Sequence, residues 1–582
     1  MENSFLENLG RYITEFYGDD TGRLCVVLPN KRAGLFLERA LSSLLESPSW
    51  SPEVFSVEEL INDISGLTPA DQAEQLVLFY SVYKKAEKEK AEPFELFSKW
   101  APTLLNDFNE ADMYLADTEK LFGNLAEIKS IENWSLGAEE LTEFQKEYVR
   151  FWSNIGRWHR VYRDLLLREK KAYPGMMYRH VADNIAQLFP QGKWKKIIFA
   201  GFNALSAAEE KIISVLRQNR QADVLWDADR YYLEDPMQEA GKFLRAHREH
   251  LFRPLPGETA SFTHVSDHFL SDEKKITVIG AAKNVSQARA AGWFLQTIPE
   301  GERFTPSTAI VLADEQLLFP VLSALPAGDD PVNITMGFPM KNSGAALFFS
   351  ALFSLHETAQ RFGITSRKGN RKYYHEDVIR LLKHPYTKEL FPGSRFTAEL
   401  ENMIRRMNLI FLSVEQLDLL NGFEDEKQIF SVFFEPWENG HDALSRTEAI
   451  IFLLQNAFSG EQEEKMNTER EYLFRVHVML NRVRSLADRL GDENSIHTTR
   501  AFFEQQMNSA TLPFSGEPLG GLQIMGLLET RTLDFRNVIL LSANENILPA
   551  GKSQQSFIVH DLRRAFGLPL WNEKDAVTAY HF

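Results

Sequence analysis

A single cysteine, Cys25, occurs among the 582 residues of the sequence. One cysteine excludes an internal disulfide, a cysteine-built zinc site and a four-cysteine iron–sulfur cluster, and it is typical of a reducing compartment. A long hydrophobic run is lacking too, since residues 344–355 span only about half of the ~20 residues that a membrane-spanning helix needs. The N-terminal segment MENSFLENLG does not have the order of a signal peptide. We therefore expect a cytoplasmic protein without a membrane partner.

The sequence also has no excess of positive charge. It contains 64 Lys and Arg residues against 81 Asp and Glu residues, which gives a net charge of −17. A protein that binds nucleic acid over its whole surface usually carries the opposite sign. Any binding of DNA must therefore depend on local basic segments.

A phosphate-binding loop of the form G-x-x-x-x-G-K-[ST] is missing. In such a loop, backbone amides, the lysine and the hydroxyl hold a nucleotide and its magnesium ion. The nearest string is Gly551-Lys552-Ser553, but Asn546 stands where the first glycine is needed, and we interpret the triplet as a surface turn. We also find no strand-borne Asp followed by a strand with [DE]-x-K, a pattern that holds the metal of many nucleases. We therefore predict no catalytic residue, cofactor site or metal site in this chain.

One group of acids resembles a metal site superficially. It lies in the segment LLNDFNEADMYLAD and comprises Asp107, Glu110, Asp112 and Asp117. Their helical spacing beside aromatic residues favours a solvated helix face or a helix cap.

Strand and helix patterns alternate in two separate parts of the chain. In the first part, apolar runs bounded by turn residues predict buried strands at 24–29, 194–202 and 222–232. In the second part, the same pattern predicts strands at 274–282, 307–314, 332–338, 519–528 and 536–545. Between the strands of each part lies a long stretch of helical periodicity, so the layout is twice an α/β domain that holds a mainly helical insertion.

The predicted domain boundaries follow from this layout. They give a first sheet domain (1–56 plus 179–255), a helical insertion (57–178), a linker (256–272), a second sheet domain (273–365 plus 515–582) and a helical insertion (366–514).

The segment LQIMGLLETRTLDFRNVILLSANENILP at 522–549 carries the most specific signal. It resembles the motif V region of superfamily I helicases of the UvrD kind, in which a strand, T-x-H-x-[SA]-K-G-L-E-F, another strand and an acid–Pro turn follow one another. The matching residues are Glu529, Thr530, Arg531, Leu533, Asp534, Phe535, Glu545 and Pro549. The segment VVLPNKRAGLFLERAL at 26–41 looks like motif Ia, and residues 556–582 are similar to the approach to motif VI.

This resemblance implies an α/β fold with two RecA-like (P-loop NTPase-like) parallel-sheet domains, each with a mainly helical insertion. Gly201 and Phe202 stand where the family carries its magnesium-binding D-E pair, so both halves of the ATP site are missing. A helicase fold without ATP chemistry resembles the AddB family of double-strand-break repair proteins. We therefore expect the non-hydrolysing, DNA-binding region of an AddB-type exonuclease.

The resemblance also implies partners and a further domain. Such a region would hold single-stranded or forked DNA while an AddA-like helicase–nuclease supplies ATP-driven movement. Members of the family usually continue into a PD-(D/E)XK nuclease domain that uses Mg²⁺. We expect that domain C-terminal to this chain, which would itself have no catalytic activity.

Two strand-end loops are the main candidates for contact with DNA phosphates. Asn30, Lys31 and Arg32 follow the first strand, and Thr530 and Arg531 are their counterparts in the second domain. As in motif Ia of the family, a loop at the end of a strand would touch single-stranded DNA.

Two basic segments are further candidates. Residues 157–180 hold seven Lys or Arg against two acids, interleaved with aromatic residues, and Arg160 and Arg163 lie there. Residues 361–372 hold Lys368 and Arg371 and no acid. The alternatives are a helix with its aromatic side in the core for the first segment and a solvated loop for the second.

Two other functions remain open at this point. The net charge would also suit a protein-interaction scaffold that has lost both ATPase and DNA binding. An active ATP-dependent helicase is the other alternative, and the missing phosphate-binding loop argues against it.

Overall fold

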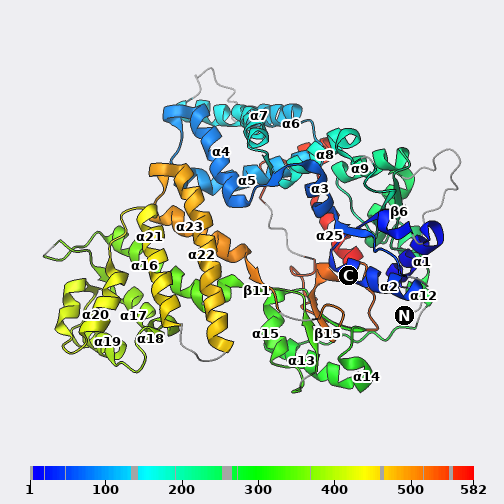
Figure 1. Ribbon diagram of the computed structural model, residues 1–582. Helices are drawn as coiled ribbons and strands as arrows, with labels where there is room; N and C mark the ends of the chain where they lie inside the picture. The colour runs from blue at the N-terminus through cyan, green and yellow to red at the C-terminus, as the bar shows by residue number, and fades with distance from the viewer. Residues whose placement is uncertain are drawn as a thin grey trace.

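The structure of the chain is a computed structural model. It describes residues 4–582 except 19, 46–47, 133–141, 191, 252–264, 272, 329, 368, 459–463, 515–516 and 550–554. The fold is α/β and 63% helical, with several small sheets. Figure 1 shows four parts: a helical region at the top, a second helical region on the left, and two sheets with their covering helices on the right and below.

The first sheet has the strand order β2–β1–β5–β6, and all neighbouring strands are parallel. Its strands are β1 (Leu24–Leu28), β2 (Glu53–Ser56), β5 (Lys196–Ala200) and β6 (Ala222–Leu225). The predicted association of 24–29 with 194–202 and 222–232 in one sheet is therefore confirmed.

Helices cover both faces of this sheet, which explains why β1 is buried along its whole length. Val26 belongs to a hydrophobic cluster with α1 (Phe5–Tyr17) and α2 (Arg32–Leu44). Val27 faces the opposite side, where α3 (Val57–Ser65), α8 (Pro174–Leu188) and α9 (Ala207–Gln218) contribute to the core. Neighbouring residues of β1 point alternately into the two cores, so every position of the strand must be apolar. The sequence LCVVL meets this requirement.

The second sheet has the order β10–β15–β9–β16 and is also parallel. Its strands are β9 (Thr308–Leu312), β10 (Val332–Ile334), β15 (Leu522–Gly526) and β16 (Asn537–Leu541). β15 and β16 flank β9, although about 200 residues separate them in sequence. The prediction that the strands near 519–545 return to the sheet formed by 307–314 is confirmed.

One predicted strand is wrong. Residues 274–282 form neither helix nor strand in the structure, and 273–280 are exposed to solvent. The next element is α13 (Asn284–Thr297), which packs against β16 and α15 (Leu318–Leu322). The local pattern is that of a strand, but a strand forms only where a neighbour completes its hydrogen bonds.

The first helical region comprises residues 72–168. Its long helices are α4 (Gln72–Glu87), α5 (Phe94–Met113), α6 (Thr118–Glu132) and α7 (Glu143–Arg168). Rings of α4, α5 and α7 form its core, with Phe79 in contact with Phe97, Phe108 and Tyr162. The two-residue strands β3 (Thr68–Pro69) and β4 (Lys171–Ala172) pair where the chain enters and leaves the region.

The second helical region comprises residues 344–509. Its helices are α16 (Gly344–Phe362), α17 (His375–Lys383), α18 (Pro385–Glu389), α19 (Phe396–Arg406), α20 (Glu424–Ser431), α21 (Gly440–Ala457), α22 (Glu464–Leu490) and α23 (Ile496–Ser509). α16 packs against α17, α22 and α23, so it belongs to this region and not to the cover of the second sheet. The chain enters and leaves through one antiparallel pair, β11 (Phe338–Pro339) with β14 (Thr511–Leu512).

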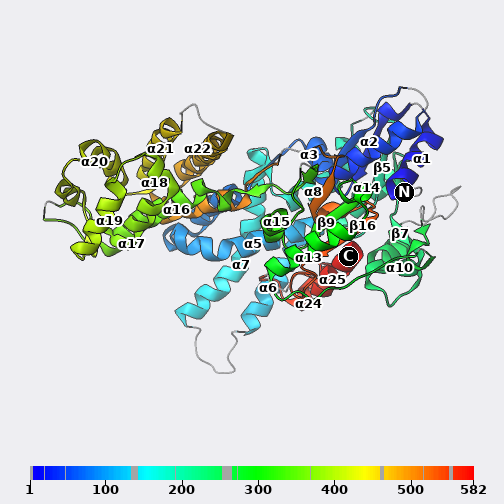
Figure 2. The ribbon, with the colours of Figure 1, turned by 90° about the horizontal axis from the view of Figure 1, so that it is seen from below.

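The C-terminal helices return across the molecule to the first sheet and the first helical region, as Figure 2 shows. They are α24 (His560–Ala565) and α25 (Trp571–His581). The Ser556 hydroxyl and the Phe557 amide donate to the Asp107 carboxylate at 2.6 and 2.8 Å, and Arg563 pairs with Glu110. No described helix is both long enough and apolar enough to cross a membrane.

Candidate nucleic-acid interface

The loop that follows β1 lies against the second sheet. The Asn30 side chain accepts from the Ala33 amide at 2.8 Å, which fixes the start of α2, and donates to the Arg531 carbonyl at 3.1 Å. The Arg32 guanidinium donates to the Pro518 carbonyl at 3.3 Å and to the Gln523 side chain. The structure therefore brings together two of the predicted loops, which the sequence placed 500 residues apart.

The second loop connects β15 to β16 and contains Thr530 and Arg531. The Thr530 hydroxyl donates to the Leu527 carbonyl at 2.7 Å, so it stabilises the short helical turn Leu527–Thr530. Thr532 has a positive φ of 61° and approaches Gly201 at the end of β5. A β-carbon at position 201 would overlap the Thr532 methyl group, so glycine is required there.

Arg32 and Arg531 are half-buried cations without an ion-pair partner among the described residues. Burial lowers the pKa of both guanidiniums, while the charge of Glu529 acts in the opposite direction on Arg32. The Nε atom of each is buried and makes no hydrogen bond. Since arginine stays charged in proteins, this junction between the two sheets holds two partly desolvated positive charges. Such a place favours an anion that brings hydrogen-bond acceptors.

Glu529 lies close to Arg32. It accepts a hydrogen bond from the Thr335 hydroxyl, and burial raises the pKa of its carboxyl group. A carboxyl group with a raised pKa protonates more readily and so carries less negative charge. Glu529 therefore neutralises the positive charge of Arg32 less well than an ordinary carboxylate would.

The remaining predicted contacts are paired within the protein. Lys31 is exposed and forms an ion pair with Glu59 at 2.8 Å. Arg160 pairs with Glu119 at 2.7 Å on the surface, and Arg163 lies 3.6 Å from the buried Asp112. Arg371 donates to the Trp437 carbonyl at 2.8 Å and pairs with Glu438 at 3.0 Å. Lys368 lies outside the described residues.

The aromatic residues of the segment 157–180 are core residues. Trp158, Tyr162 and Tyr173 are almost completely buried, and Tyr162 stacks on Tyr173 with ring centroids 5.8 Å apart. The alternative interpretation of this segment, a helix with its aromatic side in the core, is therefore confirmed for these three rings. They cannot stack on bases without unfolding the region.

The expectation for the acidic group near residue 110 is wrong for two of its members. Asp112 is buried, accepts from Tyr173 and His159, and lies 2.7 Å from Arg179. Burial raises its pKa, but His159 and the two nearby arginines bring it below its ordinary value. Asp107 is buried as well, and burial raises its pKa to about 6 despite the hydrogen bond from Ser556. These partners come from distant parts of the chain, so helical spacing gave no sign of them.

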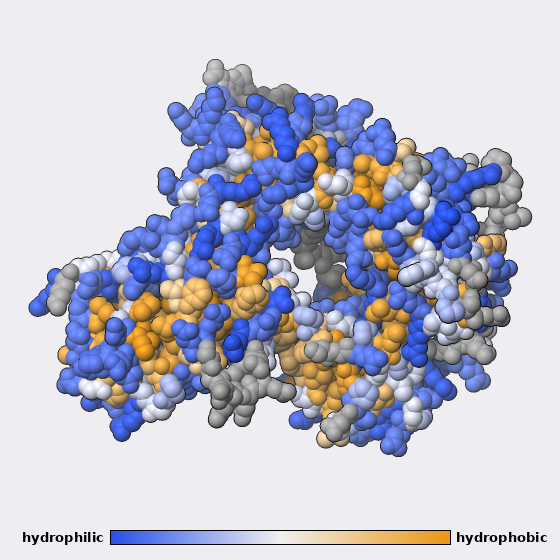
Figure 3. Space-filling view, viewed as in Figure 1, coloured by the Kyte–Doolittle hydropathy of each residue, from blue (hydrophilic) through white to orange (hydrophobic). Residues whose placement is uncertain are grey.

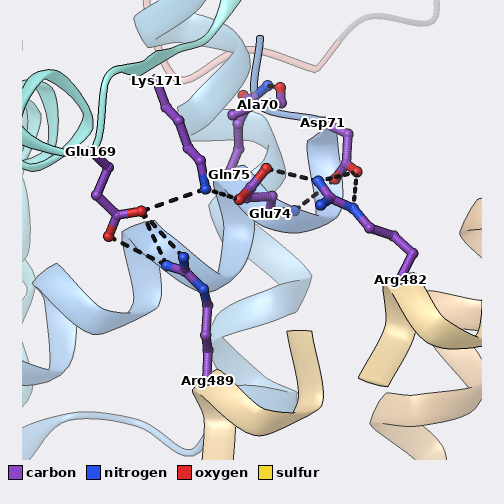
Figure 4. A network of polar contacts seen from close by, with 8 residues as sticks. All are labelled: Ala70, Asp71, Glu74, Gln75, Glu169, Lys171, Arg482 and Arg489. Carbon is purple, nitrogen blue, oxygen red and sulfur yellow. Dashed lines mark hydrogen bonds and ion pairs between the residues drawn. The ribbon is translucent and has the colours of Figure 1, made fainter. Parts of the chain in front are cut away.

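A polar network between the two helical regions was not predicted. Figure 4 shows Arg482 and Arg489 extending from α22 toward carboxylates of the first region. Arg482 donates to Asp71 at 2.9 and 3.0 Å and to Glu74 at 2.8 Å. Burial lowers the pKa of Arg482, but the two carboxylates raise it above its ordinary value overall. Lys171 also contacts Glu74, and Arg489 lies 3.3 Å from Glu169.

The surface is hollowed between the helical regions and the two sheets (Figure 3). A separate pocket of about 590 Å³ lies where α5 meets α23. Its lining includes the rings of Phe94 and Phe502 and the side-chain amides of Gln72, Asn109 and Gln505. Among the described residues, no group of three or more His, Cys, Asp or Glu is arranged to hold a metal ion.

No family model matches the chain, and no curated protein matches it.

Proposed function

We propose that this chain is the non-hydrolysing, helicase-like DNA-binding region of an AddB-type double-strand-break repair exonuclease, with two RecA-like domains. It would bind single-stranded or forked DNA and work beside an AddA-like helicase–nuclease. A magnesium-dependent nuclease domain would follow it in the natural protein.

The topology supports this proposal. Each parallel sheet is associated with its own helical region, and the motif V-like segment forms a strand, a turn and a strand. In that segment, Asp534 accepts a hydrogen bond from the Phe5 amide of the first sheet's α1 at 3.2 Å. The segment therefore lies at the junction of the two sheets, where the ends of parallel strands usually meet a ligand.

The observation that carries the proposal is the pair Arg32 and Arg531. Two partly desolvated guanidiniums, each with an Nε that makes no hydrogen bond, lie just after strands of different sheets: Arg32 at the start of α2 and Arg531 in the connection from β15 to β16. A phosphate group offers a negative charge and several acceptors, which matches what both guanidiniums lack. A chain of net charge −17 repels DNA elsewhere, so such a local site would determine where the strand binds.

The test is a titration of fluorescein-labelled single-stranded DNA at several salt concentrations, followed by anisotropy. We expect the affinity of the wild type to fall as salt rises, and the slope to decrease by roughly 0.7 for each phosphate contact removed. Arg32→Ala and Arg531→Ala should each lose one contact, whereas Arg531→Lys should retain most of the slope because it keeps the charge. Arg395→Ala is the matched control, since Arg395 lies exposed just before α19 and pairs locally with Glu399.

Two outcomes would contradict the proposal. If the Arg32 and Arg531 variants bind with the slope of the wild type, these loops do not contact phosphates. If the wild type shows no salt-dependent binding, the protein-interaction scaffold becomes the better interpretation.

A further inference from the structure

The pocket where α5 meets α23 is built from both helical regions. Gln72 and Asn109 belong to the first region, and Gln505 belongs to the second. The Gln505 side chain donates to the side-chain oxygen of Gln72 at 3.3 Å, and the ring centroids of Phe94 and Phe502 lie 5.7 Å apart. These contacts cross the boundary between the regions, so the pocket is complete only while the two regions are in contact.

Two amide side chains of the lining present donors that the protein does not use. The Asn109 side-chain oxygen accepts from the Gly175 backbone amide at 2.8 Å, and the Gln72 oxygen accepts from Gln505. Neither NH₂ group makes a hydrogen bond with another residue in the described part of the chain. An amide nitrogen carries two donors, so both groups are available to a ligand.

Three further amides of the lining present acceptors. The Gln75 NH₂ group donates to the Ala70 carbonyl at 2.7 Å, which leaves the side-chain oxygen of Gln75 as an acceptor. The Gln505 NH₂ group donates to Gln72, which leaves the Gln505 oxygen in the same state. The Asn106 side chain makes no hydrogen bond to any residue that the structure describes, so it offers both a donor and an acceptor. The pocket therefore combines several donors with several acceptors.

The charges of the pocket oppose an anionic ligand. Among the described residues that line it, none is Lys or Arg. The lining carboxylate, Glu95, accepts from the Ser495 hydroxyl at 2.7 Å, and the lining histidine, His497, pairs with Glu357. A phosphate group would therefore meet a carboxylate without a Lys or Arg to balance it. The pocket is suited to a neutral molecule.

We propose that this pocket binds a neutral nucleobase, presented as a free nucleoside. A nucleobase is a flat ring with apolar faces and an edge of donors and acceptors, and amide side chains can pair with such an edge. Phe94 and Phe502 supply apolar surface, and the amides of the lining supply partners for the edge. The volume of about 590 Å³ lies within the range of small-molecule sites.

The position of the pocket gives binding a consequence for the whole molecule. Gln72 and Gln505 come from different helical regions, so a nucleoside that contacts both binds best when the regions are docked. A ligand that prefers one state stabilises that state. The bound nucleoside would therefore hold the two helical regions together. This inference does not rest on DNA binding.

Isothermal titration calorimetry of the full chain with adenosine, guanosine, cytidine and thymidine tests this inference. We expect at least one nucleoside to bind with a dissociation constant below about 1 mM. Its 5′-monophosphate should bind about tenfold more weakly or worse, because the phosphate adds a negative charge near Glu95. Ribose, which lacks the base, should not bind.

Two variants remove a donor and keep the contact that the protein itself uses. Asn109→Asp retains the acceptor for Gly175, and Gln72→Glu retains the acceptor for Gln505, but each replaces the free NH₂ group by an oxygen. Each variant should weaken nucleoside binding by about tenfold, the effect of one lost hydrogen bond. Asn124→Asp is the matched control, because it adds the same charge at an exposed position of α6 and should bind as the wild type does.

The absence of binding by all four nucleosides would overturn the proposal, as would a monophosphate or ribose that binds as tightly as the nucleoside. Unchanged binding by Asn109→Asp and Gln72→Glu, with the folded state of both checked by circular dichroism, would place the nucleoside elsewhere and overturn it too. These measurements contain no DNA, so this inference and the proposed function fail separately.

Discussion

Gly201 and Thr532 approach each other so closely that the end of β5 in one sheet and the turn before β16 in the other have no room for a further side chain. Gly201 also has a φ of 74°, a conformation that favours glycine.

Gly201→Ala should therefore destabilise the protein in two ways, through backbone strain and through overlap with Thr532. Gly393→Ala is the matched control, because Gly393 has the same φ of 74° but has open space around its α-carbon. We expect Gly201→Ala to cost about 1–3 kcal/mol more than Gly393→Ala, the usual cost of overpacking. Urea denaturation of both variants measures the difference, and equal losses would show that the two sheets separate easily.

Arg482→Ala removes the centre of the network between the helical regions. It leaves Lys171 as the cation beside the buried Glu74 and leaves Asp71 with only its helix-capping bond to the Glu74 amide, so we expect a loss of about 1–2 kcal/mol at low salt. Arg489→Ala is the control: its pair with Glu169 is longer and partly exposed, and its loss should stay below about 1 kcal/mol. Urea denaturation at low and high salt provides the measurement. A loss for Arg482→Ala that does not shrink at high salt would mean that packing, not charge, joins the regions.

The stability of the contact between α5 and the C-terminal segment should depend on pH. Burial raises the pKa of Asp107 from 3.8 to about 6 in the folded state, so the folded protein binds the proton more tightly than the unfolded chain. Ionised Asp107 therefore costs stability above pH 6, and this cost declines as the pH falls from about 6 to about 4, the interval between the two pKa values. The maximal effect is about 3 kcal/mol for a shift of this size.

Comparison of wild type with Asp107→Asn isolates this carboxyl group. The stability of the wild type relative to the variant should increase as the pH falls from 7 to 4.5, as measured by urea denaturation. A difference that stays constant over this interval would show that Asp107 titrates normally.

Mg-ATP should not bind this chain. Gly201 and Phe202 follow β5 without a carboxylate, and the sequence lacks the loop whose amides and lysine hold the phosphates. Calorimetric titration with Mg-ATP should give no heat beyond dilution, with a P-loop ATPase as the positive control. Micromolar binding together with DNA-stimulated phosphate release would instead support the active helicase.

The buried strands could be predicted because a short run of apolar residues without alternation is typical of a strand whose two faces are both covered. The run at 24–28 is apolar throughout, the run at 308–312 is apolar after Thr308, and both are buried at every position. The segment 274–282 has an equally clear pattern and still forms no strand, since the pattern describes what a strand needs and not whether a partner is present. The return of β15 and β16 to the sheet of β9 followed from the resemblance and from chain order, but their positions on either side of β9 were not predicted.

The candidate site was predicted only in part. Asn30, Arg32 and Arg531 do lie together, because strand ends of parallel sheets meet at a common edge. Their contacts with one another could not be foreseen, since a sequence does not show which polar groups find partners 500 residues away. The same reason explains Asp107, whose partner Ser556 is 449 residues distant.

The second helical region is tied to its sheet by one narrow ribbon, β11 with β14, and it meets the first region along α22 and α23. The ribbon is a pivot, and the ion pairs of Arg482 and Arg489, together with the contact of Phe94 with Phe502, restrain rotation about it. A rise in ionic strength weakens the ion pairs, so it should allow the end of the region near α19 and α20 to move further.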